Sequence, residues 1–239
     1  MLRLTRHITP LALLIVLASC SETTGPPMDG LEGFPQLLGS IVRDPTPAGE
    51  VVHLRHSPWA PPLETYQLSF WAYKGEAETV EVHYQNGEWD DGSWEPDDDY
   101  DHPVRPFIRL HIPADGLAVD PSGDKIGKRD SVLITVQIDS SDFNVTFGPS
   151  GLQFSDKAPA SIEVWYHYAD DDLNRDGVVD DYDWSLRQSL SYWYRTEDGS
   201  PWYQVVSAND SYDDWIKTLL YHFSGYAVSW EDGPGGDAP

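Results

Sequence analysis

The segment from Asp172 to Asp183 has the spacing of side-chain oxygens that a hard cation requires. Oxygen donors stand at positions 1, 3, 5, 9 and 12 of its twelve residues, and glycine stands at position 6. Gly177 permits the left-handed backbone of a sharp turn, and the carbonyl of the following valine adds a further oxygen. The sequence therefore predicts a calcium site with these ligands: Asp172, Asn174, Asp176, Val178, Asp180 and Asp183.

These twelve residues resemble the calcium loop of EF-hands, and more closely that of dockerin modules, which also end in Asp. An EF-hand needs a helix before the loop, whereas Ser161–Tyr168 alternates like a strand. A dockerin needs two loops, and Ser207–Asp214 has acids but no glycine in register. We therefore expect an isolated calcium clip within a β domain, with a Kd on the order of 10⁻⁵ to 10⁻³ M. The alternative is a solvated acidic turn.

The N-terminus is typical of a secreted, lipid-anchored protein. Residues 1–19 combine arginines, an apolar run too short to span a bilayer comfortably, and small residues before Cys20. The sequence Leu17-Ala18-Ser19-Cys20 resembles the lipobox of bacterial lipoproteins, which implies that Cys20 is diacylated and becomes the first mature residue. It is the chain's single cysteine, which excludes an internal disulfide. By resemblance to enterobacterial sorting, Ser21 favours the outer membrane of the cell envelope.

Composition narrows the classes of partner and fold. The 239 residues carry a formal net charge of −25, which disfavours binding to nucleic acid or anionic lipid headgroups. Ten Trp and thirteen Tyr, together with short alternating segments separated by turn residues, favour an all-β antiparallel β-sandwich. We expect no more than one short helical turn, at 182–188.

The predicted organisation has four parts. Residues 1–19 form the signal peptide, and residues 20–62, rich in Pro and Gly, form the lipidated N-terminus and a tether. Residues 63–230 form the sandwich, and residues 231–239 a frayed tail. Within the sandwich we expect Tyr66–Tyr73 and Thr79–Tyr84 to pair as a hairpin, and Leu190–Arg195 to pair with Trp202–Val206.

Three segments together resemble the ZU-five domain, from about residue 106 onward. They are Phe107–Leu117, Phe147–Ile162 with its Gly-Pro-x-Gly turn, and His222–Val228. The paired glycines that usually open that domain are missing. In some ZU-five proteins a His-Phe-Ser tripeptide cleaves itself. That resemblance implies Ser224 as nucleophile, His222 as general base and Phe223–Ser224 as the scissile bond.

Other sites remain alternatives. Trp71, Trp89, Trp94, Trp193 and Trp202 would serve a carbohydrate-binding module if they stack on sugar rings, whereas a core role would bury them. The acidic residues Asp97, Asp98, Asp99 and Asp101 form a second, weaker cation hypothesis. The sequence has no nucleophile elbow, phosphate loop or paired-histidine metal motif. We therefore expect a non-catalytic, calcium-stabilised, membrane-anchored module with a surface protein or glycan as partner.

Overall fold

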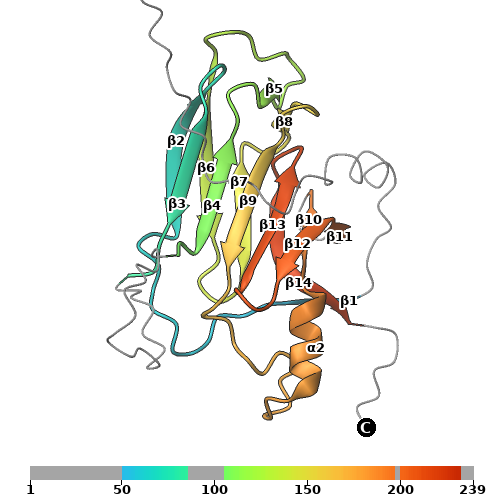
Figure 1. Cartoon of the computed structure of the whole chain (residues 1–239). Coiled ribbons are helices and arrows are strands. Elements are labelled where there is room, and N and C mark those ends of the chain that lie inside the picture. The colour runs from blue at the N-terminus through green and yellow to red at the C-terminus, as the bar shows by residue number, and fades with distance from the viewer. Residues whose placement is uncertain (1–49, 86–104, 197–199, 233–239) are drawn as a thin grey trace, which may run out of the picture.

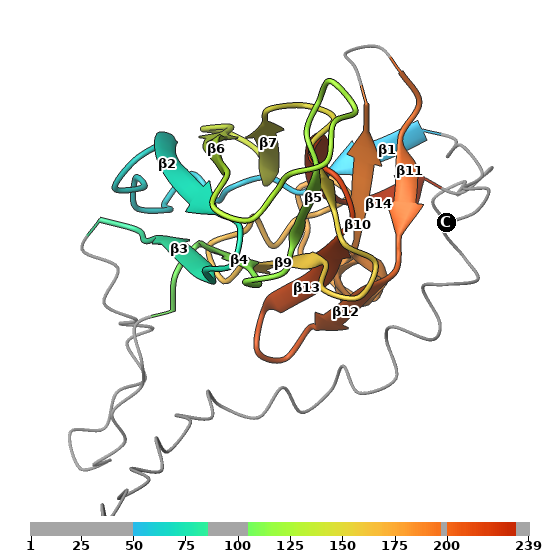
Figure 2. The same cartoon turned by 90° about the horizontal axis from the view of Figure 1, so that it is seen from above.

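The computed structural model describes residues 50–85, 105–196 and 200–232, which form two antiparallel sheets packed as two layers (Figures 1 and 2). The seven-stranded sheet has the order β11-β10-β14-β7-β6-β2, with β1 paired to β14. Its strands are β1 (Glu50–His53), β2 (Gln67–Tyr73), β6 (Ser131–Ile138), β7 (Asn144–Gly148), β10 (Ser191–Arg195), β11 (Tyr203–Val205) and β14 (Gly225–Asp232).

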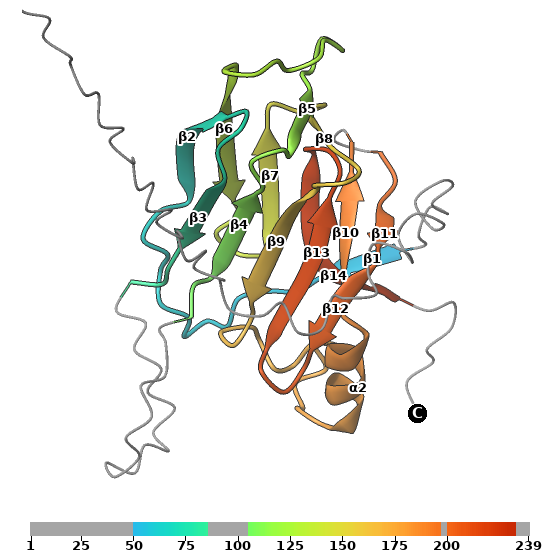
Figure 3. The same ribbon diagram turned by 45° about the horizontal axis from the view of Figure 1, so that its top comes forward.

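The opposite layer is a five-stranded sheet with the order β12-β13-β9-β4-β3. Its strands are β3 (Glu78–Val82), β4 (Ile108–Ile112), β9 (Ala160–Trp165), β12 (Ser207–Asp210) and β13 (Trp215–Leu220). A two-stranded sheet of β5 (Leu117–Val119) and β8 (Gln153–Phe154) lies at one end of the sandwich, far from the helix α2 (Figure 3). The predicted all-β antiparallel sandwich is confirmed.

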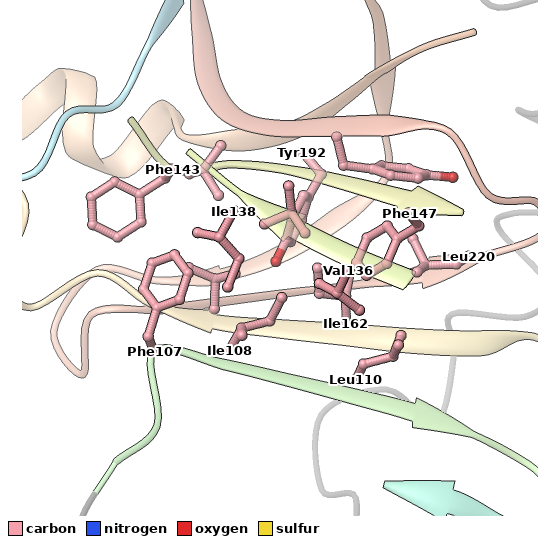
Figure 4. Packing of buried hydrophobic residues seen from close by; sticks show 14 of the residues in the cluster. Phe107, Ile108, Leu110, Val136, Ile138, Phe143, Phe147, Ile162, Tyr192 and Leu220 are labelled. Atoms are coloured by element: carbon pink, nitrogen blue, oxygen red, sulfur yellow. The ribbon is translucent and has the colours of Figure 1, made fainter. Parts of the chain in front are cut away.

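The core lies between the two layers and follows from period-two alternation. In β4, Ile108, Leu110 and Ile112 are at most 2% exposed, whereas the residues between them are partly exposed. Val136 and Ile138 of β6 project from the opposite sheet into the same core (Figure 4). Successive strand side chains point to opposite faces, so one apolar face per strand suffices to build the sandwich.

The expected hairpin between Tyr66–Tyr73 and Thr79–Tyr84 is wrong. β2 pairs with β6 and β3 pairs with β4, so the connection between β2 and β3 crosses from one sheet to the other. Its backbone bonds to other loops: Lys74 N donates to Asp130 O (2.9 Å) and Gly75 N to Ala114 O (2.8 Å). A short turn after a strand does not by itself distinguish a hairpin from a crossover.

The folded part begins earlier than composition indicates. β1 lies within the segment 20–62 expected to be a tether, yet it pairs with β14 along four residues. Leu54, which follows β1, is 2% exposed and belongs to the core. At the other end, β14 continues to Asp232, into the expected tail. The signal peptide, Cys20 and the rest of the tail lie outside the described residues.

The helix α2 (Asp181–Ser189) begins within the last three residues of the segment predicted to bind calcium. It is longer than the single turn expected at 182–188. The helix and the loop before it connect β9 of the five-stranded sheet with β10 of the seven-stranded sheet, at one end of the sandwich (Figure 1). β10 then pairs with β11, as predicted.

Candidate functional site

The first half of the loop folds its acidic side chains back onto its own backbone. The carboxylate of Asp172 accepts hydrogen bonds from Asp176 N (3.1 Å) and Gly177 N (2.8 Å). The side-chain oxygen of Asn174 accepts from the same Asp176 N (3.0 Å), so these two side-chain oxygens converge. Gly177 has φ +87°, the left-handed turn that its position predicts. Asn174 Nδ2 also donates to the Asp176 carboxylate (2.9 Å), so the side chains at positions 1, 3 and 5 lie together.

Side chains in the second half of the loop cap the N-terminus of α2. Asp180 is the N-cap and accepts from Tyr182 N (2.8 Å), while Asp183 accepts from Asp180 N (3.0 Å), which completes a capping box. Asp183 is 2% exposed and also accepts from Leu173 N (2.8 Å) and Asn174 N (3.1 Å). Its carboxylate therefore ties the beginning of the loop to the helix that ends it.

Three contacts fasten this connection to the sandwich. Leu173 is 4% exposed and packs in the core. Arg175, at φ +62°, donates from its guanidinium to the carbonyl oxygen of His53 at the end of β1 (3.3 Å). Arg187 of α2 forms an ion pair with Asp214 (2.9 Å), just before β13. Burial raises the pKa of Asp214, and the neighbouring guanidinium opposes that rise. The loop is thus linked to both sheets.

The donor set fits an oxygen-coordinated cation in part. Within residues 50–85, 105–196 and 200–232, no three His, Cys, Asp or Glu side chains are grouped closely enough to hold a metal. Asn174 and the Val178 carbonyl add oxygens outside those residue types. Asp180 and Asp183 already accept backbone N–H groups, but a carboxylate offers about four lone-pair sites and can accept further partners. Asp172, Asn174 and Asp176 accept backbone N–H groups as well, and what distinguishes them is that their side chains lie together.

The His222-Phe223-Ser224 segment precedes β14. Phe223 is 1% exposed and stacks on Phe147, with ring centroids 4.9 Å apart. Ser224 is 3% exposed, and its hydroxyl has no hydrogen-bond partner among the described residues. Burial raises the pKa of the Tyr226 hydroxyl, and the nearby Ser224 opposes that rise. The Tyr226 hydroxyl donates its hydrogen bond to the His222 carbonyl oxygen (2.7 Å).

The imidazole of His222 packs against the rings of Tyr194 and Tyr226. Among the described residues it makes no hydrogen bond with the Ser224 hydroxyl. It makes an edge contact with Tyr194 at 4.9 Å. Burial lowers the pKa of His222, which favours the neutral ring that a general base requires. The implied scissile carbonyl, that of Phe223, accepts from Gly151 N (3.2 Å). Self-cleavage at Phe223–Ser224 stays a prediction.

The tryptophans considered for sugar stacking have different surroundings. Trp71 is 52% exposed on the outer face of β2, which is an edge strand of the described sheet. Trp193 is 2% exposed and its indole N–H donates to Ser229 O (3.0 Å), so this residue cannot stack on a ligand. Trp202 is partly buried beneath the guanidinium of Arg195 (4.7 Å). Trp89, Trp94 and the acidic residues Asp97, Asp98, Asp99 and Asp101 lie outside the described residues.

Sequence reasoning missed a hollow on the outer face of the seven-stranded sheet, lined by residues of β7, β10 and β14. Asn144, Arg195 and Gly225 lie far apart in the sequence, so they form no local motif. The one available signal is Gly225 at the start of a strand, where a missing side chain often marks a close approach or an open space.

No protein-family model, curated protein or solved structure matches the chain. Membership in the ZU-five family or among bacterial lipoproteins therefore rests on the sequence resemblances alone and stays a prediction. Among the described residues, none of the helices has the length and apolar character needed to cross a membrane.

Proposed function

We propose that this protein is a lipid-anchored, non-catalytic module of the bacterial cell envelope, whose β-sandwich is stabilised by one calcium ion. The observation that carries the proposal is that the side chains of Asp172 and Asn174 share the Asp176 N–H group and that Asn174 also contacts the Asp176 carboxylate, in a loop that connects the two sheets. The module would act in structure or in surface interactions, and Cys20 would anchor it to the membrane, with the outer membrane favoured.

A bound calcium ion would supply positive charge to a loop crowded with carboxylates. Asp172 and Asp176 would bind through carboxylate oxygens, Asn174 through its amide oxygen and Val178 through its carbonyl. Asp183 would hold the first residues of the loop against the N-terminus of α2, because its carboxylate already accepts the N–H groups of Leu173 and of the N-cap residue Asp180. Since Leu173 is buried in the core, ordering this loop also orders the connection between the sheets.

Thermal unfolding of the mature chain tests this proposal. A ligand that binds only the folded state stabilises it by about 2.7 kcal/mol at a concentration 100 times its Kd. For a domain of this size, 1 kcal/mol corresponds to roughly 2–4 °C, so calcium should raise the Tm by about 5–10 °C over EDTA. The variant Asp172→Asn/Asp176→Asn removes both negative charges while it keeps one of the two acceptor oxygens at each position, and it should lose the calcium response.

The matched control is Asp181→Asn, which removes one negative charge from the first turn of α2 without removing a proposed ligand. It should respond to calcium as the wild type does. A Tm that is the same in calcium and EDTA for the wild-type chain would show that the loop is only an acidic turn that caps a helix.

A further inference from the structure

The outer face of the seven-stranded sheet has a hollow of about 220 Å³ where β7, β14 and β10 lie side by side. The register places Thr146 and Arg195 on either side of Gly225, and Asn144 opposite Ala227. Val145 and Phe147 of β7 are buried in the core, so the alternating Asn144 and Thr146 belong to the outer face.

Gly225 keeps the floor of this hollow open. A Cβ atom added there would meet Arg195 Cγ and O at 3.8 Å and Thr146 Oγ1 at 3.9 Å. These are ordinary contact distances, so the fold would accept a methyl group at this position. Glycine therefore leaves space over the strand that any larger residue would fill.

The walls of the hollow combine uncharged hydrogen-bonding groups with one cation, Arg195, and three aromatic residues, Phe147, Trp202 and Tyr226. Its described lining contains no carboxylate, although the chain has 40 acidic residues. The Asn144 side-chain oxygen is buried with no hydrogen-bond partner among the described residues. Trp202 is held between the guanidinium of Arg195 (4.7 Å) and an edge contact with His53 (5.0 Å). A buried acceptor without a partner costs stability, which a ligand hydroxyl would recover once the Asn144 side chain turns toward the hollow.

We propose that this hollow binds a single neutral, hydroxyl-rich ring, such as one sugar residue of a glycan. The volume is below the roughly 300–1,000 Å³ typical of pockets for drug-sized ligands, which limits the occupant to about one ring. A carboxylate or phosphate could not donate to the Asn144 oxygen, and the net charge of −25 would repel it. The proposal does not depend on calcium binding.

Saturation-transfer NMR and Trp fluorescence of the full chain, in a detergent without sugar headgroups, would test this site. The probes are methyl glucoside, methyl galactoside, methyl mannoside, N-acetylglucosamine and glucuronic acid. We expect a neutral sugar to bind with a Kd on the order of 1 mM, as befits one small ring. Gly225→Ala, which fills the floor, and Asn144→Ala, which removes the acceptor, should each weaken binding at least tenfold at unchanged Tm.

The matched control is Trp71→Ala, which removes the exposed indole on β2, at the edge of the same sheet. It should bind sugar as the wild type does. Three results would overturn the proposal: no binding of any probe, binding of glucuronic acid alone, or a loss in Trp71→Ala with normal binding by Gly225→Ala. Repeating the titration in EDTA separates this site from the calcium loop, because sugar binding should persist if the chain remains folded.

Discussion

Two partly buried histidines lie in one aromatic cluster, where both rings contact Tyr84. His56 stacks on Phe143 with ring centroids 4.2 Å apart, and His167 makes an edge contact with Tyr84 at 5.6 Å. Burial lowers the pKa of His56 and of His167 from 6.5 to about 4 in each case. Both rings are therefore neutral in the folded protein at neutral pH, and protonating either would place a charge among apolar rings.

This burial predicts loss of stability in mild acid. Below pH 6.5 the unfolded chain binds protons at these histidines, whereas the folded chain does so only near pH 4. The stability they contribute is therefore complete above pH 6.5 and is lost as the pH falls toward 4, by about 3 kcal/mol for each. Urea unfolding across this range should show the decline, and His56→Phe, which keeps the ring stack, should reduce it. A flat profile would contradict the burial of these rings.

At the scale of elements, the outer face of the five-stranded sheet carries alternating charges in one cross-strand row. Glu81, Arg109, Glu163 and Lys217 are paired in register across β3, β4, β9 and β13. Arg109 Nε donates to Glu81 (2.5 Å) and its Nη1 to Glu163 (3.1 Å), while Lys217 also donates to Glu163. Burial alone would raise the pKa of Glu81, but Arg109 outweighs it and lowers that pKa.

Because the row joins four strands, its central charges should couple. Arg109→Met keeps an apolar side chain but removes the charge and the guanidinium that lies over Trp165 (5.0 Å), and should destabilise the fold by about 1–2 kcal/mol. In a double-mutant cycle, Glu163→Gln should cost less in the Arg109→Met background than in the wild type. High salt should reduce the difference. Strictly additive effects would mean that the row contributes nothing beyond its separate side chains.

At the scale of the whole molecule, we expect an acidic β-sandwich that is tethered to the membrane by a lipid-anchored N-terminal segment. One acyl chain gives marginal membrane binding, whereas two or more give a stable anchor, so the expected diacylated Cys20 would hold the protein at the membrane. The charge of −25 would keep the sandwich away from anionic headgroups. The anchor and the folded domain would then act at different distances from the bilayer.

The anchor makes a direct prediction. Cys20→Ser should abolish incorporation of labelled palmitate and shift the protein from the membrane fraction to the soluble fraction. Ser21→Ala keeps the cysteine and should still be labelled and membrane-bound. Retention of Cys20→Ser in the membrane fraction would show that the protein is held there by something other than a lipid.

The strands were predictable wherever alternation was strong. The alternating segment Ser131–Ile138 forms one strand over its whole length, and the alternating Ile108, Leu110 and Ile112 share one buried face. Gly177 has the positive φ that its position in the loop predicts. These features depend on local backbone geometry and on which side chains avoid water, and both are properties of short segments.

By itself, the sequence determined the class of fold, the positions of most strands and the spacing of oxygens in the loop at 172–183. Only the tertiary structure decided that β2 and β3 belong to different sheets, that β1 completes one of them, and that Trp193 is buried. It alone brought Asn144, Arg195 and Gly225 around one hollow. The physical reason is that strand pairing and burial depend on contacts between residues far apart in the chain, which alternation within one strand does not specify.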